Sequence, residues 1–260
     1  MLGVALGCAF AQSATTALEL LQQLDATLVQ QSLSPTELTL AAVSTDPKGT
    51  SFPLTLVAGE QVLIVATGDP AAITDLDLWI VDRETGEVLL QDDLDNNVPV
   101  IAFTAPAAAT YELRVLAADL APEASWGYFA LAVAEPSEAA QGSSAIAALD
   151  EAVRALEAEG YAVYQGHVVS MTPGVQRGVS VWLPPANHCL AVAVGGPGVR
   201  RLDLYAGSPW SSLIDVDQRN GPLGILGFPA QGDGEYVFVM EPRKARGSSV
   251  DAALVVGCRN

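Results

Sequence analysis

Five aspartates are the strongest candidate for a chemical site in this sequence. Asp75 and Asp77 are two residues apart, so in a strand they share one face. Asp92, Asp93 and Asp95 follow in an acidic loop. Clustered carboxylates are what a calcium ion needs, since it takes six to eight oxygen ligands. The spacing predicts a calcium site, with Ca²⁺ as the candidate cofactor; the alternative is that these acids keep the protein soluble and its sheet edges unpaired.

The two histidines, His167 and His188, are the other residues that could do chemistry. The sequence contains no G-x-S-x-G, H-E-x-x-H, G-x-x-x-x-G-K or C-x-x-C motif. His188 and Cys189 adjoin in a predicted strand, where alternation sends them to opposite faces. We therefore expect a protein that is not an enzyme. The alternative is a secreted hydrolase with a site between two modules, around one of the histidines.

Charge excludes some classes of protein. The 260 residues hold 30 Asp and Glu against 12 Lys and Arg, a net charge of −18, so nothing offsets repulsion from nucleic-acid phosphates. Half the residues are hydrophobic and 16% are charged, which excludes a disordered acidic chain. The charge is uneven: residues 36–136 hold 16 acids and 3 bases, whereas residues 161–260 hold 7 acids and 8 bases.

An internal repeat organises these residues. The strand motif around Asp77 (LDLW) returns around Asp203 (LDLY), an offset of 126, and the tyrosine-centred strand at Tyr111 returns at Tyr236, an offset of 125. At matched positions the second half carries Arg200, Arg201 and Arg219 in place of acidic or neutral residues. We expect these guanidinium groups to stand where the first half would hold a cation.

The elements that position these residues repeat too. Amphipathic helices are predicted over residues 14–31 and 143–159, and short alternating strands fill residues 37–134 and 162–257 between turn signals. The prediction is a mainly β protein of two tandem antiparallel β-sandwiches, jelly-roll-like, each preceded by one helix. The expected divisions are 12–136 for the helix and first sandwich, 137–160 for the linker and second helix, and 161–260 for the second sandwich.

The stretch from Val62 to Val133 resembles the bacterial pre-peptidase C-terminal domain. An apolar strand ending in Gly precedes the D-L-D-L-aromatic strand, a D-x-x-x-G turn, the acidic loop and the TYELRV strand. The second half keeps LDLY and G-E-Y but has a degenerate middle loop. The resemblance implies two diverged tandem copies of a small sandwich that is otherwise appended to secreted hydrolases, and hence binding or targeting rather than catalysis.

The N-terminus and the cysteines indicate export. Residues 1–11 (MLGVALGCAFA) are apolar and end in an A-x-A-like cleavage site, typical of a signal peptide, here without its basic start. Cleavage there removes Cys8 and leaves Cys189 and Cys258, which we expect to form a disulfide in an oxidising compartment. The alternatives are a buried helix turn and two reduced thiols.

These observations together predict an exported binding or envelope-interaction protein, secreted or periplasmic in a bacterium. Its partner is expected to be a protein or polysaccharide surface, and Trp126 and Trp210 lie in loop-like sequence where a ring could stack on a sugar. No nucleic acid and no transmembrane segment are expected, because the longest apolar run is too short for a span. A structural role, in which the helices mediate self-association, is the third alternative.

Overall fold

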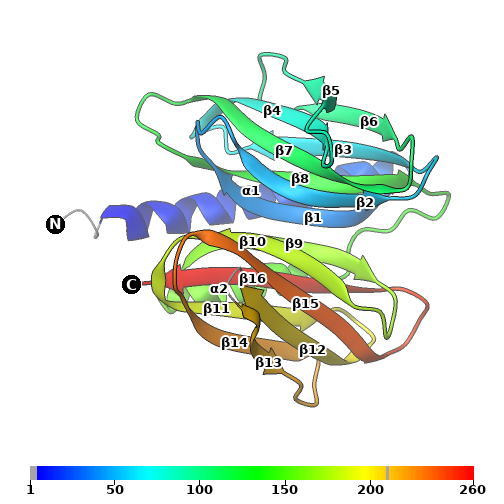
Figure 1. Cartoon of the computed structure of the whole chain (residues 1–260), viewed down its shortest axis with the longest axis vertical. Helices are drawn as coiled ribbons and strands as arrows, with labels where there is room; N and C mark the ends of the chain where they lie inside the picture. Colours follow the sequence, from blue (N-terminus) through cyan, green and yellow to red (C-terminus); the bar gives the residue numbers. More distant parts are fainter. Residues whose placement is uncertain (1–4, 209–210) are drawn as a thin grey trace. The chain divides into compact units, whose positions relative to one another are not determined.

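The computed structural model describes residues 5–208 and 211–260, with side chains described from residue 14 onward except at 209–212. Within these ranges the chain forms two helices and sixteen strands (Figure 1). The first half contains α1 (Ala5–Gln30), β1 (Leu33–Val43), β2 (Thr50–Leu56), β3 (Gln61–Gly68), β4 (Ile73–Asp82), β5 (Val88–Asp92), β6 (Val100–Thr104), β7 (Ala109–Leu120) and β8 (Gly127–Pro136). The second contains α2 (Ile146–Ala158), β9 (Ala162–Met171), β10 (Arg177–Leu183), β11 (Ala186–Gly195), β12 (Val199–Ser208), β13 (Ser211–Asp217), β14 (Leu223–Ala230), β15 (Gly234–Ala245) and β16 (Val250–Arg259).

Each half is an eight-stranded jelly roll. In the first, one sheet has the order β1-β8-β3-β6 and the other the order β2-β7-β4-β5. In the second, the corresponding orders are β9-β16-β11-β14 and β10-β15-β12-β13, so strand n of the first sandwich matches strand n + 8 of the second. All pairings within these four sheets are antiparallel. The predicted fold class, with sandwiches of the jelly-roll type, is confirmed.

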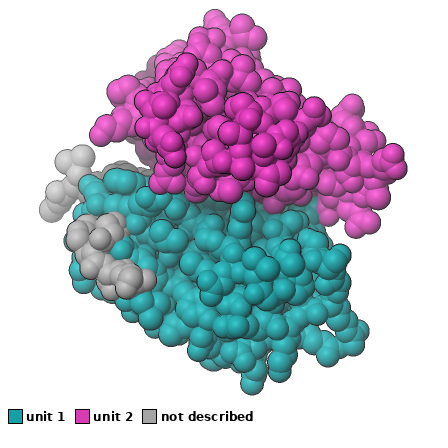
Figure 2. All heavy atoms as spheres, turned by 45° about the vertical axis from the view of Figure 1, so that its right-hand side comes forward, with its two compact units in different colours: residues 1–14, 143–260 teal, residues 15–142 magenta. Residues whose placement is uncertain are grey.

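The chain divides into two compact units, residues 15–142 and residues 143–260 together with 1–14 (Figure 2). The expected signal peptide is not tested: residues 1–4 lie outside the described residues, and residues 5–11 form the start of α1. No helix in the described part of the chain has the length and apolar character that a membrane crossing requires.

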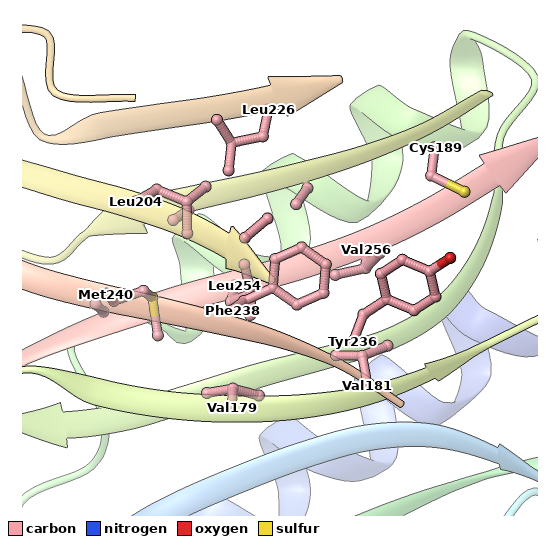
Figure 3. Close-up of a cluster of buried hydrophobic side chains, with 14 of the residues drawn as sticks. Val179, Val181, Cys189, Leu204, Leu226, Tyr236, Phe238, Met240, Leu254 and Val256 are labelled. Atoms are coloured by element: carbon pink, nitrogen blue, oxygen red, sulfur yellow. The ribbon is translucent and has the colours of Figure 1, made fainter. Parts of the chain in front are cut away.

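Alternating burial builds each sandwich. β14 alternates exposed and buried residues along its whole length, which is the pattern of a strand with one face on a core and one in solvent. In the second sandwich Leu204, Phe238 and Met240 from one sheet meet Leu226 and Leu254 from the other (Figure 3). A matching core lies in the first sandwich, between Leu78 and Leu113 on one sheet and Ile64, Phe129 and Leu131 on the other.

Helix α2 covers only one sheet of the second sandwich. Its buried residues Leu149, Val153 and Leu156 recur at helical spacing, and the helix contacts β9, β16 and β11. Glycines in these strands allow a close approach: a Cβ at Gly166 would lie 3.0 Å from Leu149 Cδ1. The solvent-facing side of the other sheet, β10-β15-β12-β13, therefore stays free of α2.

Candidate functional site

The aspartates predicted to bind calcium lie at one end of the first sandwich. Asp75 and Asp77 belong to β4, and Asp92 ends β5, where it stands opposite Leu78 of β4. Burial raises the pKa of Asp77 above its ordinary value, and the negative charges of Asp75, Asp93 and Asp92 raise it further. Asp75, Asp92 and Asp93 therefore lie close enough to Asp77 for their charges to act on its carboxylate.

Backbone amides and a glutamine already bond several of these carboxylates. Asp75 Oδ1 accepts a bond from the Asn96 amide at 3.1 Å, and Asp92 Oδ2 accepts one from the Val100 amide at 2.8 Å. Asp93 Oδ2 accepts a bond of 2.8 Å from the Gln91 side chain. Asp95 is exposed in the same loop. Among the residues that the structure describes, no group of three or more His, Cys, Asp or Glu side chains is arranged to hold a metal ion.

Arginines neutralise the matched carboxylates of the second sandwich. Asp203, the counterpart of Asp77, is fully buried and bonds Arg201 Nε at 2.8 Å. Arg243 Nε also donates to Asp203, at 3.2 Å, while its Nη1 lies 2.8 Å from Glu241. Glu241 is buried as well and accepts a bond from Gln176. The result is a network of two acids and two arginines on the solvent-facing side of the sheet.

Asp217, the counterpart of Asp92, has its own arginine. Arg219 donates from Nε and Nη2 to this carboxylate, at 2.9 and 2.5 Å. Hydrogen bonds from Arg219 hold the pKa of Asp217 far below its usual range, and the Ile225 amide adds another. Of the three arginines expected to take the place of a cation, Arg201 and Arg219 each pair with one of these carboxylates; their equivalence to a bound cation stays a prediction. Arg200 is exposed, and no pattern in the sequence indicates that Arg243 joins this network.

The sheets β2-β7-β4-β5 and β10-β15-β12-β13 differ in the polarity of their solvent-facing sides. In the first sandwich Glu112 and Arg114 of β7 form an ion pair of 2.7 Å, and Ser51 of β2 donates to Glu112. In the second sandwich the matched β15 positions hold Val237 and Val239, each preceded and followed by core residues. The change from an ion pair to two valines makes this part of the second sheet apolar.

Aromatic and apolar neighbours extend this surface, which we call the outer face: Trp182, Tyr205, Val216, Val237 and Val239. Trp182 is 61% exposed and stands opposite Glu235, where the first sandwich has Thr55. Tyr205 lies between Val239 and Val216 in register, and both Val216 and Val237 are exposed. These five residues adjoin one another across β10, β15, β12 and β13, which makes them the candidate interaction surface of this sheet.

Tyr205 is fixed within the outer face by its hydroxyl group. Gln218 donates to this hydroxyl at 2.9 Å. Arg243 also bonds it, and hydrogen bonds to Tyr205 and Asp203 raise the pKa of Arg243. The buried acid network therefore reaches the aromatic ring through Arg243. We did not predict this face from the sequence. The repeat nevertheless indicates it, because Glu112 and Arg114 of the first half align with Val237 and Val239 of the second.

The histidines occupy two different environments. His167 is buried, and its Nε2 lies 3.2 Å from Gln165 Oε1. Burial, aided by the charge of Arg177, lowers the pKa of His167 to about 3, so the ring is neutral at pH 7. His188 is exposed, and its Nδ1 shares a 2.7 Å hydrogen bond with the Tyr161 hydroxyl.

Cys189 and Cys258 form the expected disulfide, between β11 and β16. Both cysteines point into the core of the second sandwich, whereas His188 is exposed, as strand alternation predicted.

Trp126, predicted to lie where a ring could stack on a sugar, is partly buried, and its ring packs edge-on against Tyr128 with 5.3 Å between the ring centroids. Trp210 lies outside the described residues.

No protein-family model and no curated protein matches this sequence. Among solved structures, the pre-peptidase C-terminal domain of collagenase from Bacillus anthracis is similar at a TM-score of 0.31 and 13% identity, over 38% of this chain and 89% of that one. PliG, a periplasmic inhibitor of g-type lysozyme from Aeromonas hydrophila, gives 0.28 and 16%, over 36% and 84%. The N-terminal CBM22-1-CBM22-2 tandem domain of Xyn10C from Paenibacillus barcinonensis gives 0.26 and 11%, over 85% and 86%. Scores this low do not carry the functions of those proteins over to this chain.

Proposed function

We propose that this chain is an exported, non-catalytic binding protein made of two tandem sandwiches similar to pre-peptidase C-terminal domains, and that it binds a polysaccharide on the outer face. The observation that carries the proposal is the difference between matched positions of the two sandwiches. Where the first has Thr55 and the Glu112–Arg114 ion pair, the second presents Trp182 and two valines. The first sandwich adopts the same fold with polar residues at these positions, so folding does not require the apolar residues of the second. We infer that they serve binding.

A sugar chain fits this face chemically. Exposed aromatic rings offer a flat apolar surface with polar groups at the edge, and Trp182 has Glu235 and Ser180 beside it. Tyr205 is held at the far end of the face by Gln218 and Arg243. Trp182 and Tyr205 lie on the two strands that flank β15, opposite Glu235 and Val239, which are about 13 Å apart along β15. A ligand that touches both rings therefore needs more than one sugar unit.

Two features support export without catalysis. The disulfide between Cys189 and Cys258 is typical of an oxidising compartment, and it makes Cys189 unavailable as a nucleophile beside His188. His167 is neutral and buried, which suits a structural role. The secreted or periplasmic location and the signal peptide at residues 1–11 belong to this proposal.

The experiment is affinity electrophoresis of the full chain through gels that contain single soluble polysaccharides. The variants Trp182→Ala and Tyr205→Ala should each weaken retardation about fivefold, since each removes about 1 kcal/mol of ring contact. The matched control, Thr55→Ala with Trp79→Ala, changes the equivalent positions of the first sandwich and should leave retardation unchanged. Equal retardation of the ring variants and the wild type, or no retardation by any polysaccharide, would overturn the proposal.

Calcium stabilisation of the first sandwich stays a prediction. Mutual repulsion around Asp77 supports it, and so do the arginines at the matched positions of the second sandwich. A bound cation would neutralise the carboxylates of the first sandwich, as Arg201 and Arg219 neutralise the matched carboxylates of the second.

A further inference from the structure

The second sandwich concentrates positive charge at one end of its free sheet. Of the twelve lysines and arginines in the sequence, five lie on two neighbouring segments at the start of β12 and the end of β15. We call this set the basic end; its members are Arg200, Arg201, Arg243, Lys244 and Arg246.

The basic end is one continuous surface in the fold. Arg201 stands opposite Lys244 in the β12–β15 ladder. The Arg246 amide bonds the Gly198 carbonyl at 3.1 Å, which continues the pairing of the two segments. Arg200, Arg243, Lys244 and Arg246 are all exposed, and Arg201 is partly exposed. Their charges therefore act from one place toward solvent.

The acids on the same two segments offset only part of this charge. On residues 198–203 and 241–246 the acids are Asp203 and Glu241, both buried beneath Arg201 and Arg243. The two segments keep an excess of three positive charges on a chain of net charge −18. This positive surface attracts anions, whereas the negative net charge of the rest of the protein repels them.

The matched end of the first sandwich has the opposite sign. There Asp75 stands opposite Asp119 in the β4–β7 ladder, where the second sandwich has Arg201 opposite Lys244. Residues 72–77 and 116–121 contain three acids and no base. The jelly-roll fold is compatible with either sign at this end, so folding does not account for the basic residues.

The basic end adjoins the outer face. Tyr205 is two residues from Asp203 on the same strand face, and Arg243 bonds both the Tyr205 hydroxyl and the Asp203 carboxylate. A ligand that stacks on Tyr205 therefore reaches the exposed guanidinium of Arg243, and beyond it Lys244. We propose, building on the function proposed above, that the ligand is an acidic polysaccharide whose carboxylate groups bind the basic end while its sugar rings lie on the outer face.

The test compares a carboxylated polysaccharide, polygalacturonate, with an uncharged one, soluble β-glucan, by affinity electrophoresis at low and high salt. The variant Arg200→Ala/Lys244→Ala/Arg246→Ala removes three exposed charges and leaves the buried network intact. The control, Lys48→Ala/Arg83→Ala/Arg154→Ala, removes three exposed charges elsewhere. We expect about tenfold weaker binding of polygalacturonate in the first variant only, and a similar loss on adding salt.

The outcomes separate this inference from the proposed function. Binding of both polysaccharides that depends on Trp182 but not on the three basic residues would overturn the acidic ligand and leave the binding face in place. Binding of polygalacturonate that depends on the basic residues but not on Trp182 and Tyr205 would overturn both, since charge alone would then hold the polymer. A salt-sensitive increase in mass by light scattering without polysaccharide, lost in the basic variant, would overturn the inference in favour of the acidic sandwich of a second copy.

Discussion

His167 makes the stability of the second sandwich depend on pH. Its strand neighbours at positions 169 and 171 are in the core, and the histidine faces the same side, where burial lowers its pKa to about 3. In the unfolded chain the pKa of a histidine is about 6.5. Protonation therefore favours the unfolded chain, so the stabilisation is present above pH 6.5 and is lost as the pH falls toward 3.

The size of the effect follows from the two pKa values. Each pH unit between them is worth about 1.4 kcal/mol, so at pH 5 the second sandwich should have lost about 2 kcal/mol of its free energy of unfolding through His167 alone. The variant His167→Gln has no ring to protonate, so its free energy of unfolding should lack this contribution to the pH dependence. A lower starting stability of the variant at pH 7 does not affect the comparison, because the measured quantity is the change in the free energy of unfolding with pH.

The assay is urea unfolding of the full chain at pH 7 and pH 5, followed by tryptophan fluorescence. The wild type should lose about 2 kcal/mol more than His167→Gln on acidification, and the surface variant His188→Gln should behave as the wild type does. Carboxylates that titrate in the same range are common to all three proteins and cancel in the difference. An equal loss in the wild type and His167→Gln would refute the reasoning, and would show that the buried ring is protonated in the folded protein.

Three further predictions concern the ion, the disulfide and the core. Millimolar calcium should raise the melting temperature of the first sandwich relative to EDTA, and Asp75→Asn/Asp77→Asn should abolish the shift; no shift in the wild type would leave these acids solvated. Replacing Cys189 and Cys258 by alanine should lower the free energy of unfolding by about 4 kcal/mol, the value for a loop closed by residues 69 apart, and a loss under 1 kcal/mol in urea would contradict this. Phe238→Ala removes a fully buried ring and should cost about 3–5 kcal/mol in the second sandwich, with calorimetry showing the first sandwich unchanged.

The fold could be predicted because its signals are local or repeated. Strand β14 alternates in sequence as it does in burial, and the offset between Tyr111 and Tyr236 predicted that the two halves share one order of elements. Aspartates 75 and 77 were placed correctly on one strand for the same reason.

The charged network could not be predicted, because its members meet only when β12 and β15 pair. Arg243 and Asp203 are forty residues apart and interact across this ladder. Their contact depends on the register of the two strands, which no local pattern specifies. The burial of His167 was also hidden, because period-two alternation assigns a residue to a face of the strand without saying which face meets the core.

The pairing of the first and last strands in each sandwich has a consequence for how the protein folds. Leu33 pairs with Pro136, and Ala162 pairs with Cys258, so each sheet is joined by partners about a hundred residues apart. Neither sandwich can close its sheet until its final strand is available, and such non-local pairing makes folding slow. During synthesis the first sandwich must wait for β8 and the second for β16. Each half can therefore complete its fold only after its last strand, β8 in the first and β16 in the second.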